Sequence, residues 1–372
     1  MTMSIRATPF HARAADANRG NLWAQRGRFT LASEYAGVAQ EAAAARFAVA
    51  MADISWRWRV RLEGARLREL TQRLFTKDPN ALEPGQALKA LWLADQGGVR
   101  GAGVVARLAR QSFELTAACE DAAWIGAAAS LFAVTLTDRT EEEGGLALIG
   151  PYAEKLVATL GLDATLAPLA FRAVSWKGLD VTLTRFGEHG GYEIWCKPDD
   201  APLVWDRVAA AGEPFALQPA GLDAMDLLDL EAGVPRPGRD YDGATAPDAA
   251  EPLAGALRLA SLIDGDHPFN GAVQAHAHLP RRKLTGLLID SDTPAPFAPV
   301  FLAGKAVGRT LSSRYSPFLR RAIALVQLDE AHAAPGTALS LTLPSSRGAL
   351  PKQAAARVTD LPFIPPPASI PA

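Results

Sequence analysis

Cysteine is scarce in this sequence, since only Cys119 and Cys196 occur among 372 residues. The two stand far apart, with neither a Cys-x-x-Cys pair nor a cysteine–histidine spacing of the zinc type. We therefore expect neither a disulfide framework nor a structural zinc site. Two reduced thiols are typical of an intracellular protein.

An excess of charge of either sign is also missing, since 38 basic residues face 40 acidic ones and the net charge is −2. Bulk electrostatics thus favour neither a nucleic-acid partner nor a membrane. The N-terminal segment has no apolar core of the signal-peptide type. The most apolar stretch, residues 122–136, contains Gly, Ser and Thr and is shorter than the ~20 residues of a membrane span. We expect a cytoplasmic protein that acts on a small molecule, and its oligomeric state stays open.

The first part of the chain combines weak and strong signals. Residues 1–30 are expected to be poorly ordered, and the alanine-rich residues 31–51 predict a helix. The segment "ISWRWRVRLEG" alternates apolar side chains with polar ones that include Arg57, Arg59 and Arg61. This alternation predicts a half-buried strand with a basic outer face.

Residues 54–140 predict an α+β unit in the order strand, helix, three strands, helix, strand. A Gly-Gly pair at 97–98 marks a hairpin, and Asp121 begins the second helix. After this unit, "VTLTRFGEHGGYEIWCK" predicts a second hairpin, and residues 200–212 and 221–233 predict helices.

From Arg282 onward, short strands alternate with Gly, Pro and Ser turns, which is typical of a β-barrel or sandwich. The proline-rich tail "LPFIPPPASIPA" is expected to be extended and loosely held. The overall fold class is α+β.

Four segments in order carry a family resemblance: "TRFGEHGGYEIW", "GLDAMDLLDLEAGVPRPGRDYD", "HPFNGA" and "VGRTLSSRYSPFLRRAIAL". Over nearly the whole chain, the sequence resembles the aminomethyltransferase family, which comprises the glycine cleavage T-protein and its folate-dependent relatives. The resemblance implies a three-domain cloverleaf around a central hole that holds tetrahydrofolate. The corresponding parts are residues 1–53 (start of domain 1), 54–140 (ferredoxin-like domain 2), 141–270 (rest of domain 1 with the pterin site) and 271–372 (C-terminal β-barrel).

Glu193 takes the place of the family glutamate that binds the pterin. A carboxylate suits this role because it accepts paired hydrogen bonds from the amino group and ring N–H of a pterin. From the residues alone, a solvated acid on a strand face is the favoured interpretation of Glu193. Arg185 matches the family arginine before the turn. Tyr192 and Trp195 are candidate pocket walls, with core packing as the alternative.

The sequence departs from the family at its reaction centre and at the folate tail. Gly101 and Ala102 replace two aspartates, one of which lies near the reacting nitrogen in T-proteins. Alanines stand where the next strand carries an asparagine, and Met225 and Asp229 replace two arginines near the folate tail. The resemblance thus implies folate binding at the pterin end but does not extend to the tail, and glycine cleavage is not expected.

Other residues are candidates for contacts with the substrate. Lys89 and Arg100 flank the altered hairpin and suit a carboxylate or a phenolate, unless they lie on a solvated strand face. Arg236, Arg239 and Tyr241 lie in a loop that faces the hole in relatives.

Histidines supply two further candidates. His189 in the glycine-rich bend is a candidate proton carrier. His276 and His278 have strand spacing but no third ligand nearby, so no metal site is expected.

Three functions are consistent with these features. The first is a one-carbon enzyme that moves a methyl or hydroxymethyl-level unit from a small, aromatic or carboxylate substrate to tetrahydrofolate. "GGYEIW" resembles the Gly-Gly-Tyr-Glu form of folate-dependent demethylases. The second is a folate-independent lyase that releases formaldehyde from a hydroxymethylated aromatic compound. The third, a non-catalytic folate-binding protein, ranks last because relatives of that type carry a Lys-Gly-Cys-Tyr-x-Gly-Gln segment that is absent here.

Overall fold

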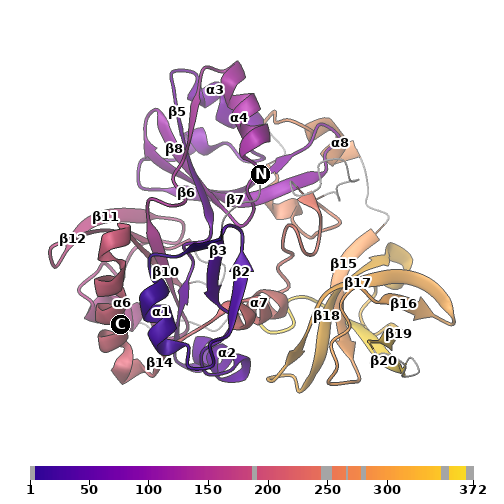
Figure 1. The fold of residues 1–372 in the computed structure, drawn as a ribbon. Helices are drawn as coiled ribbons and strands as arrows, with labels where there is room; N and C mark the ends of the chain where they lie inside the picture. Colours follow the sequence, from indigo (N-terminus) through magenta and orange to yellow (C-terminus); the bar gives the residue numbers. More distant parts are fainter. Residues whose placement is uncertain are drawn as a thin grey trace. The chain divides into compact units, whose positions relative to one another are not determined.

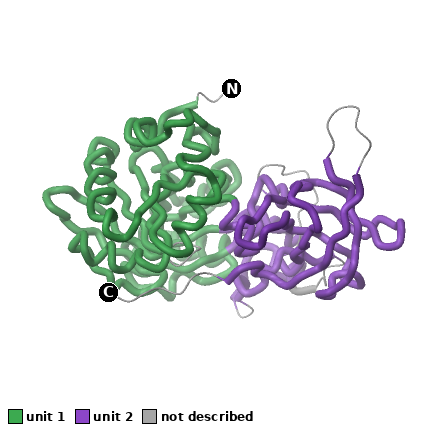
Figure 2. The backbone as a smooth tube through the Cα atoms, turned by 90° about the horizontal axis from the view of Figure 1, so that it is seen from below, with its two compact units in different colours: residues 1–90, 103–226, 366–372 green, residues 91–102, 227–365 purple. Residues whose placement is uncertain are grey.

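The computed structural model describes residues 5–186, 191–243, 254–264, 267–277, 282–344 and 352–365. The chain forms two compact units (Figure 2), which are described separately. The first consists of residues 1–90, 103–226 and 366–372, and the second of residues 91–102 and 227–365.

Residues 5–30 are ordered, so the expectation of a poorly ordered segment was wrong for them. The N-terminal segment contains helix α1 (His11–Ala17) and a three-stranded sheet in the order β1-β3-β2, with β1 Arg6–Ala7, β2 Trp23–Arg26 and β3 Phe29–Ala32. Phe10 is fully buried, with its ring centroid 6.2 Å from that of Trp205. Such short elements leave too few residues for a periodic pattern, although isolated apolar anchors hold them.

A six-stranded sheet forms the centre of the first unit, in the order β11-β12-β13-β10-β4-β14. Its strands are β4 (Val49–Asp53), β10 (Gly144–Ile149), β11 (Phe171–Trp176), β12 (Leu179–Thr184), β13 (Tyr192–Cys196) and β14 (Leu217–Pro219). Helix α2 covers only Val38–Phe47 and begins after Gly37, whose φ is 99°. The single helix expected over 31–51 is therefore wrong, because β3 and β4 flank a shorter one.

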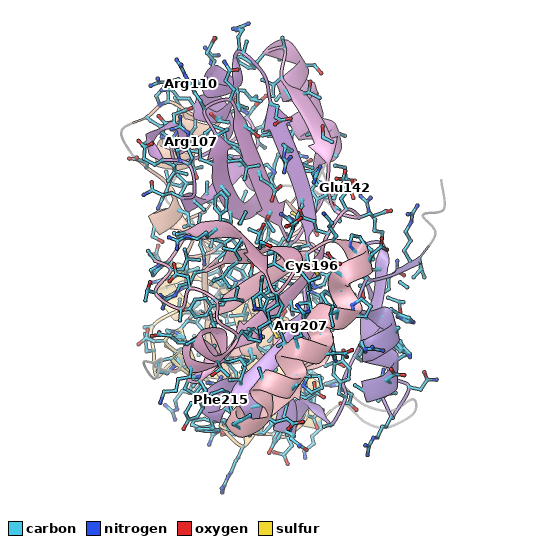
Figure 3. All side chains as sticks on the ribbon, turned by 90° about the vertical axis from the view of Figure 1, so that its left-hand side faces the viewer. Arg107, Arg110, Glu142, Cys196, Arg207 and Phe215 are labelled. Carbon is cyan, nitrogen blue, oxygen red and sulfur yellow. The ribbon has the colours of Figure 1, made fainter. Side chains whose placement is uncertain are left out.

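One face of this sheet packs against helices α5 (Ala153–Thr159) and α6 (Ala201–Gly212). The apolar core between them includes Leu148 and Ile194 from the strands and Leu156 and Val204 from the helices. Figure 3 shows α6 between the labelled Cys196 and Phe215. Burial raises the pKa of the Cys196 thiol to about 12, so this cysteine is an apolar packing residue.

A five-stranded sheet in the order β6-β7-β8-β5-β9 confirms the predicted order of elements over 54–140. Its elements are β5 (Trp58–Glu63), α3 (Leu67–Leu74), β6 (Ala87–Leu93), β7 (Val99–Ala109), β8 (Ser112–Ala117), α4 (Ala122–Leu131) and β9 (Thr135–Asp138). The prediction of a basic outer face was wrong at Arg59, which is buried and forms ion pairs with Glu114 and Glu143. Alternation predicts the side to which a residue points, but not whether other elements cover that side.

The second unit contains a closed barrel in the order β15-β18-β17-β16-β19-β20, which confirms the predicted C-terminal barrel (orange to yellow in Figure 1). Its strands are β15 (Arg282–Ile289), β16 (Pro299–Leu302), β17 (Lys305–Ser316), β18 (Arg321–Asp329), β19 (Ala338–Leu343) and β20 (Lys352–Thr359). The prediction of a loosely held tail was wrong at Leu361 and Ile364, which are buried. The Ile364 N–H donates to the Glu231 carbonyl at 3.1 Å.

Two helices and five short 3-10 turns complete the described elements. The helices are α7 (Leu222–Glu231) and α8 (Ala272–Ala277), and the turns are Pro79–Ala81, Pro198–Asp200, Glu213–Phe215, Ala260–Leu262 and Glu330–His332. Because residues 272–277 are helical, the strand spacing expected for His276 and His278 was wrong; both side chains lie outside the described residues. No helix in the part of the chain that the structure describes has the length and apolar character of a membrane span.

Candidate functional site

Glu193 occupies the middle of the six-stranded sheet. On β13 it faces Thr184 of β12 on one side and Ala147 of β10 on the other. Only 1% of its side chain is exposed, so the interpretation as a solvated strand-face acid is wrong. A buried carboxylate requires hydrogen-bond donors, which the neighbouring residues supply.

Three side chains donate to the Glu193 carboxylate. Arg57 Nη1 lies 2.5 Å from Oε1. Thr184 Oγ1 lies 3.0 Å from Oε2, and Trp195 Nε1 lies 3.2 Å from the same oxygen. These bonds supply both oxygens of the buried carboxylate with hydrogen-bond donors.

The three donors differ in whether local sequence patterns place them next to Glu193. Trp195 shares the face of Glu193 by strand alternation, and hairpin register could have placed Thr184 opposite it. Arg57 comes from a segment 136 positions earlier, and no local signal links it to Glu193.

Trp195 lies flat over β10 on the face that carries Glu193. A Cβ on Gly145 would come within 2.6 Å of its ring, and the Arg59 guanidinium stacks 4.1 Å from its centroid. Trp195 also lines a cavity of about 370 Å³ together with Thr182, Ala173 and other residues of β11 to β13. It is therefore both packed and part of a cavity wall.

Tyr192 and Arg185 lie on the opposite face from Glu193. Tyr192 belongs to the apolar core, where burial raises its pKa and its hydroxyl donates to the Ala164 carbonyl at 2.5 Å. Arg185 stacks 5.1 Å from the Tyr192 ring and donates to the Leu166 carbonyl at 2.9 Å. Tyr192 therefore fits the core-packing alternative, whereas Trp195 lines a cavity; residues three apart on a strand point to opposite faces. Arg185 and Tyr192 do not join the Glu193 cluster.

In the second unit, the structure brings Arg100 and Tyr241 together around Gly243. A Cβ on Gly243 would lie 2.5 Å from the Arg100 carbonyl oxygen and 3.2 Å from Cε2 of Tyr241. Arg100 is buried, so the solvated-face alternative is wrong for it. Lys89 is half-buried on the part of β6 that belongs to the first unit.

The altered hairpin has no room for a side chain at position 101. A Cβ on Gly101 would lie 2.1 Å from Cζ2 of the fully buried Trp92. An indole ring thus fills the space in which the resemblance places a carboxylate.

Arg236 and Arg239 lie in a turn that is hydrogen-bonded to the barrel through Asp240. Asp240 Oδ2 accepts the Arg236 N–H at 2.9 Å, and Oδ1 accepts the Ser312 N–H at 2.8 Å. Ser312 lies in an irregularity of β17, which frees its N–H from the strand ladder. The Arg236 guanidinium also lies 4.0 Å from the carboxylate of Asp229, so the acid that replaces a family arginine has a cationic neighbour.

Within the described ranges, no group of three His, Cys, Asp or Glu side chains is arranged to hold a metal ion. His189 lies outside these ranges.

Comparisons with known proteins agree with this architecture. A family model described as the GCVT N-terminal domain matches residues 11–255, and another, the glycine cleavage T-protein C-terminal barrel domain, matches residues 282–364. The chain is 34% identical to an aminomethyltransferase of Frankia alni, with 87% of this chain and 90% of that protein covered. An aminomethyltransferase of Symbiobacterium thermophilum is 31% identical, with 91% and 92% covered. The fold is similar to the glycine cleavage system aminomethyltransferase T from Bartonella henselae, with a TM-score of 0.85, 24% identity and coverage of 99% of this chain and 100% of that one.

Proposed function

This chain belongs to the glycine cleavage T-protein (aminomethyltransferase) family, and from this premise we propose that it transfers a methyl or hydroxymethyl-level unit from a small substrate to tetrahydrofolate. The family uses tetrahydrofolate, which supplies a nitrogen acceptor for the one-carbon unit. The observation that carries the proposal is the buried Glu193, whose Oε1 accepts a hydrogen bond from Nη1 of the planar Arg57 guanidinium. The 2-amino and ring N–H edge of a pterin is a donor of the same kind, so the residues present fit that end of the cofactor.

The substrate class follows from the candidate residues of the second unit. Arg100 and Arg236 are buried cations, and Tyr241 is a buried phenol beside the Arg100 backbone. Guanidinium groups recognise carboxylates and stack on aromatic rings. We therefore assign an aromatic or carboxylate substrate. In this proposal Arg100 and Tyr241 act on the reacting group of the substrate, and Arg236 and Arg239 bind the substrate.

A second candidate function is supported by the indole of Trp92 over Gly101. Because a carboxylate cannot occupy position 101 without moving this ring, glycine cleavage chemistry is disfavoured. A folate-independent lyase that releases formaldehyde from a hydroxymethylated aromatic compound would not require that carboxylate. Release of formaldehyde from such compounds in the absence of any folate would favour the lyase.

The test of the first function is calorimetric titration of the purified protein with tetrahydrofolate under anaerobic conditions. Glu193→Gln removes one carboxylate oxygen and the charge, so we expect about 10- to 100-fold weaker binding, as for the loss of hydrogen bonds to a charged group. Glu114→Gln is the matched control, because Glu114 is also a buried acid paired with arginine but not with Arg57. Absence of binding by the native protein contradicts the folate-dependent function, and unchanged binding by Glu193→Gln contradicts the role of that residue.

A further inference from the structure

Arg57 is the donor on the accessible side of Glu193. The Arg57 side chain is 22% exposed, whereas that of Glu193 is 1% exposed. Each carboxylate oxygen accepts about two hydrogen bonds. Among the described residues, Oε2 has two donors, Thr184 and Trp195, whereas Oε1 has one, Arg57. Oε1 thus has room for one further donor, so a ligand that offers two adjacent donors has to take the place of Arg57.

The guanidinium of Arg57 and the donor edge of a pterin are chemically alike. Both are planar groups in which neighbouring N–H bonds point the same way, the geometry that a carboxylate accepts as a fork. Among the described residues, Glu193 is the only hydrogen-bond or ion-pair partner of the Arg57 side chain. Among the described residues, the Arg57 guanidinium is thus held by its contact with Glu193 alone.

We propose that Arg57 is an internal competitor of the pterin for Glu193, and so determines which ligands this site accepts; the inference rests on the function proposed above. In the closed state Arg57 occupies Oε1. In the open state the ligand donors replace it, and the guanidinium turns to solvent. Only a ring with adjacent amino and ring N–H donors replaces both the charge-assisted bond and its geometry. A ring that lacks the amino group leaves Arg57 in place.

The competitor role predicts that removal of Arg57 increases the affinity for tetrahydrofolate, whereas removal of an ordinary binding residue decreases it. If the closed state is favoured by nine to one or more, removal of Arg57 tightens the apparent binding of tetrahydrofolate by about tenfold or more. An arginine that contacts the bound ligand would have the opposite effect, and a bystander would have none.

The experiment is calorimetric titration of the full-length native protein, Arg57→Met and Arg61→Met with tetrahydrofolate. Arg61 is the matched control, because it loses the same charge at a similarly exposed position (28%) while its partner is Glu114. We expect about tenfold tighter binding for Arg57→Met and unchanged binding for Arg61→Met. Arg57→Gln, which keeps one donor for Glu193, should bind with intermediate affinity, and it replaces Arg57→Met if that variant does not fold.

The outcomes separate this inference from the proposed function. If the native protein binds and Arg57→Met binds equally or more weakly, the competitor role is overturned and the folate-dependent function stands. If both arginine variants gain affinity alike, general electrostatics explain the effect and the competitor role is again overturned. If neither the native protein nor any variant binds tetrahydrofolate, the proposed function fails and this inference fails with it.

Discussion

Thr184 and Glu193 face each other across the β12–β13 hairpin, and the Thr184 hydroxyl donates to Oε2 of Glu193 at 3.0 Å. Both side chains are buried. The position of the carboxylate is therefore fixed by strand register. A ligand group on a strand is held more rigidly than one on a loop.

Thr184→Val removes this donor while it keeps the β-branched shape. We expect the free energy of unfolding to fall by about 1.5–3 kcal/mol, the usual worth of a hydrogen bond to a charged group. Chemical denaturation measures it. Thr182→Val is the control, because Thr182 is on the same strand and has no side-chain hydrogen bond within the described part of the chain; its change should stay within about 0.5 kcal/mol. Equal losses in the two variants would contradict the role of the Thr184 hydroxyl.

The β12–β13 hairpin could be predicted from the sequence, because period-two alternation around glycines is a local signal. The same alternation places Tyr192 and Glu193 on opposite faces, so their assignment to one site conflicted with the pattern from which the strand was predicted. The partner of Glu193 could not be predicted: Arg57 lies on another element, and its own alternation suggested only a solvated basic face. Burial of Arg59 was missed for the same reason, since nothing local marks Glu114 and Glu143 as its partners.

Gly101→Ala should destabilise the protein, because its Cβ would lie 2.1 Å from the ring of Trp92. Trp92 is fully buried. Overpacking of this kind costs about 1–3 kcal/mol or more. In contrast, Gly126→Ala in α4 meets nothing within 4 Å and should stabilise the protein by about 0.5–1 kcal/mol, as expected for a helix interior. Thermal unfolding of both variants measures these opposite shifts, and a neutral Gly101→Ala would show that the indole yields easily.

Arg59→Met should be among the most damaging substitutions in the first unit. It leaves Glu114 and Glu143 without their shared guanidinium and removes the cation over Trp195. Loss of one partner from a buried ion pair costs about 3–5 kcal/mol, and only the longer contacts of Arg61 with Glu114 and of Arg139 with Glu143 remain. Arg66→Met breaks the exposed pair with Glu69 and the contact with the Phe132 ring, so it should cost far less than Arg59→Met. Denaturation midpoints compare the two, and similar values would mean that the Arg59 network is not cooperative.

Asp53 gives the protein a pH dependence that can be tested by substitution. Burial raises the pKa of its carboxyl above 3.8, although hydrogen bonds from Ser55 and Thr8 oppose the shift. Thr8 Oγ1 and Ser55 Oγ each lie 2.6 Å from a carboxylate oxygen. The folded state thus binds this proton more tightly than the unfolded state does. The stabilisation is fully present below pH 3.8 and is lost as the pH rises through the higher native pKa.

Asp53→Asn keeps an acceptor for the Ser55 N–H but carries no proton to lose. Its stability relative to the native protein should therefore improve as the pH rises from about 4, and it should level off above the native pKa of Asp53. Asp163→Asn should show the opposite pH dependence of stability. The hydrogen bond from Thr165 lowers the pKa of Asp163. The native carboxylate therefore stabilises the fold above pH 3.8, and this stabilisation is lost in acid. Urea denaturation of the three proteins between pH 3 and 8 yields both differences. A difference between Asp53→Asn and the native protein that stays constant over this range would show that Asp53 titrates alike in the folded and unfolded chains.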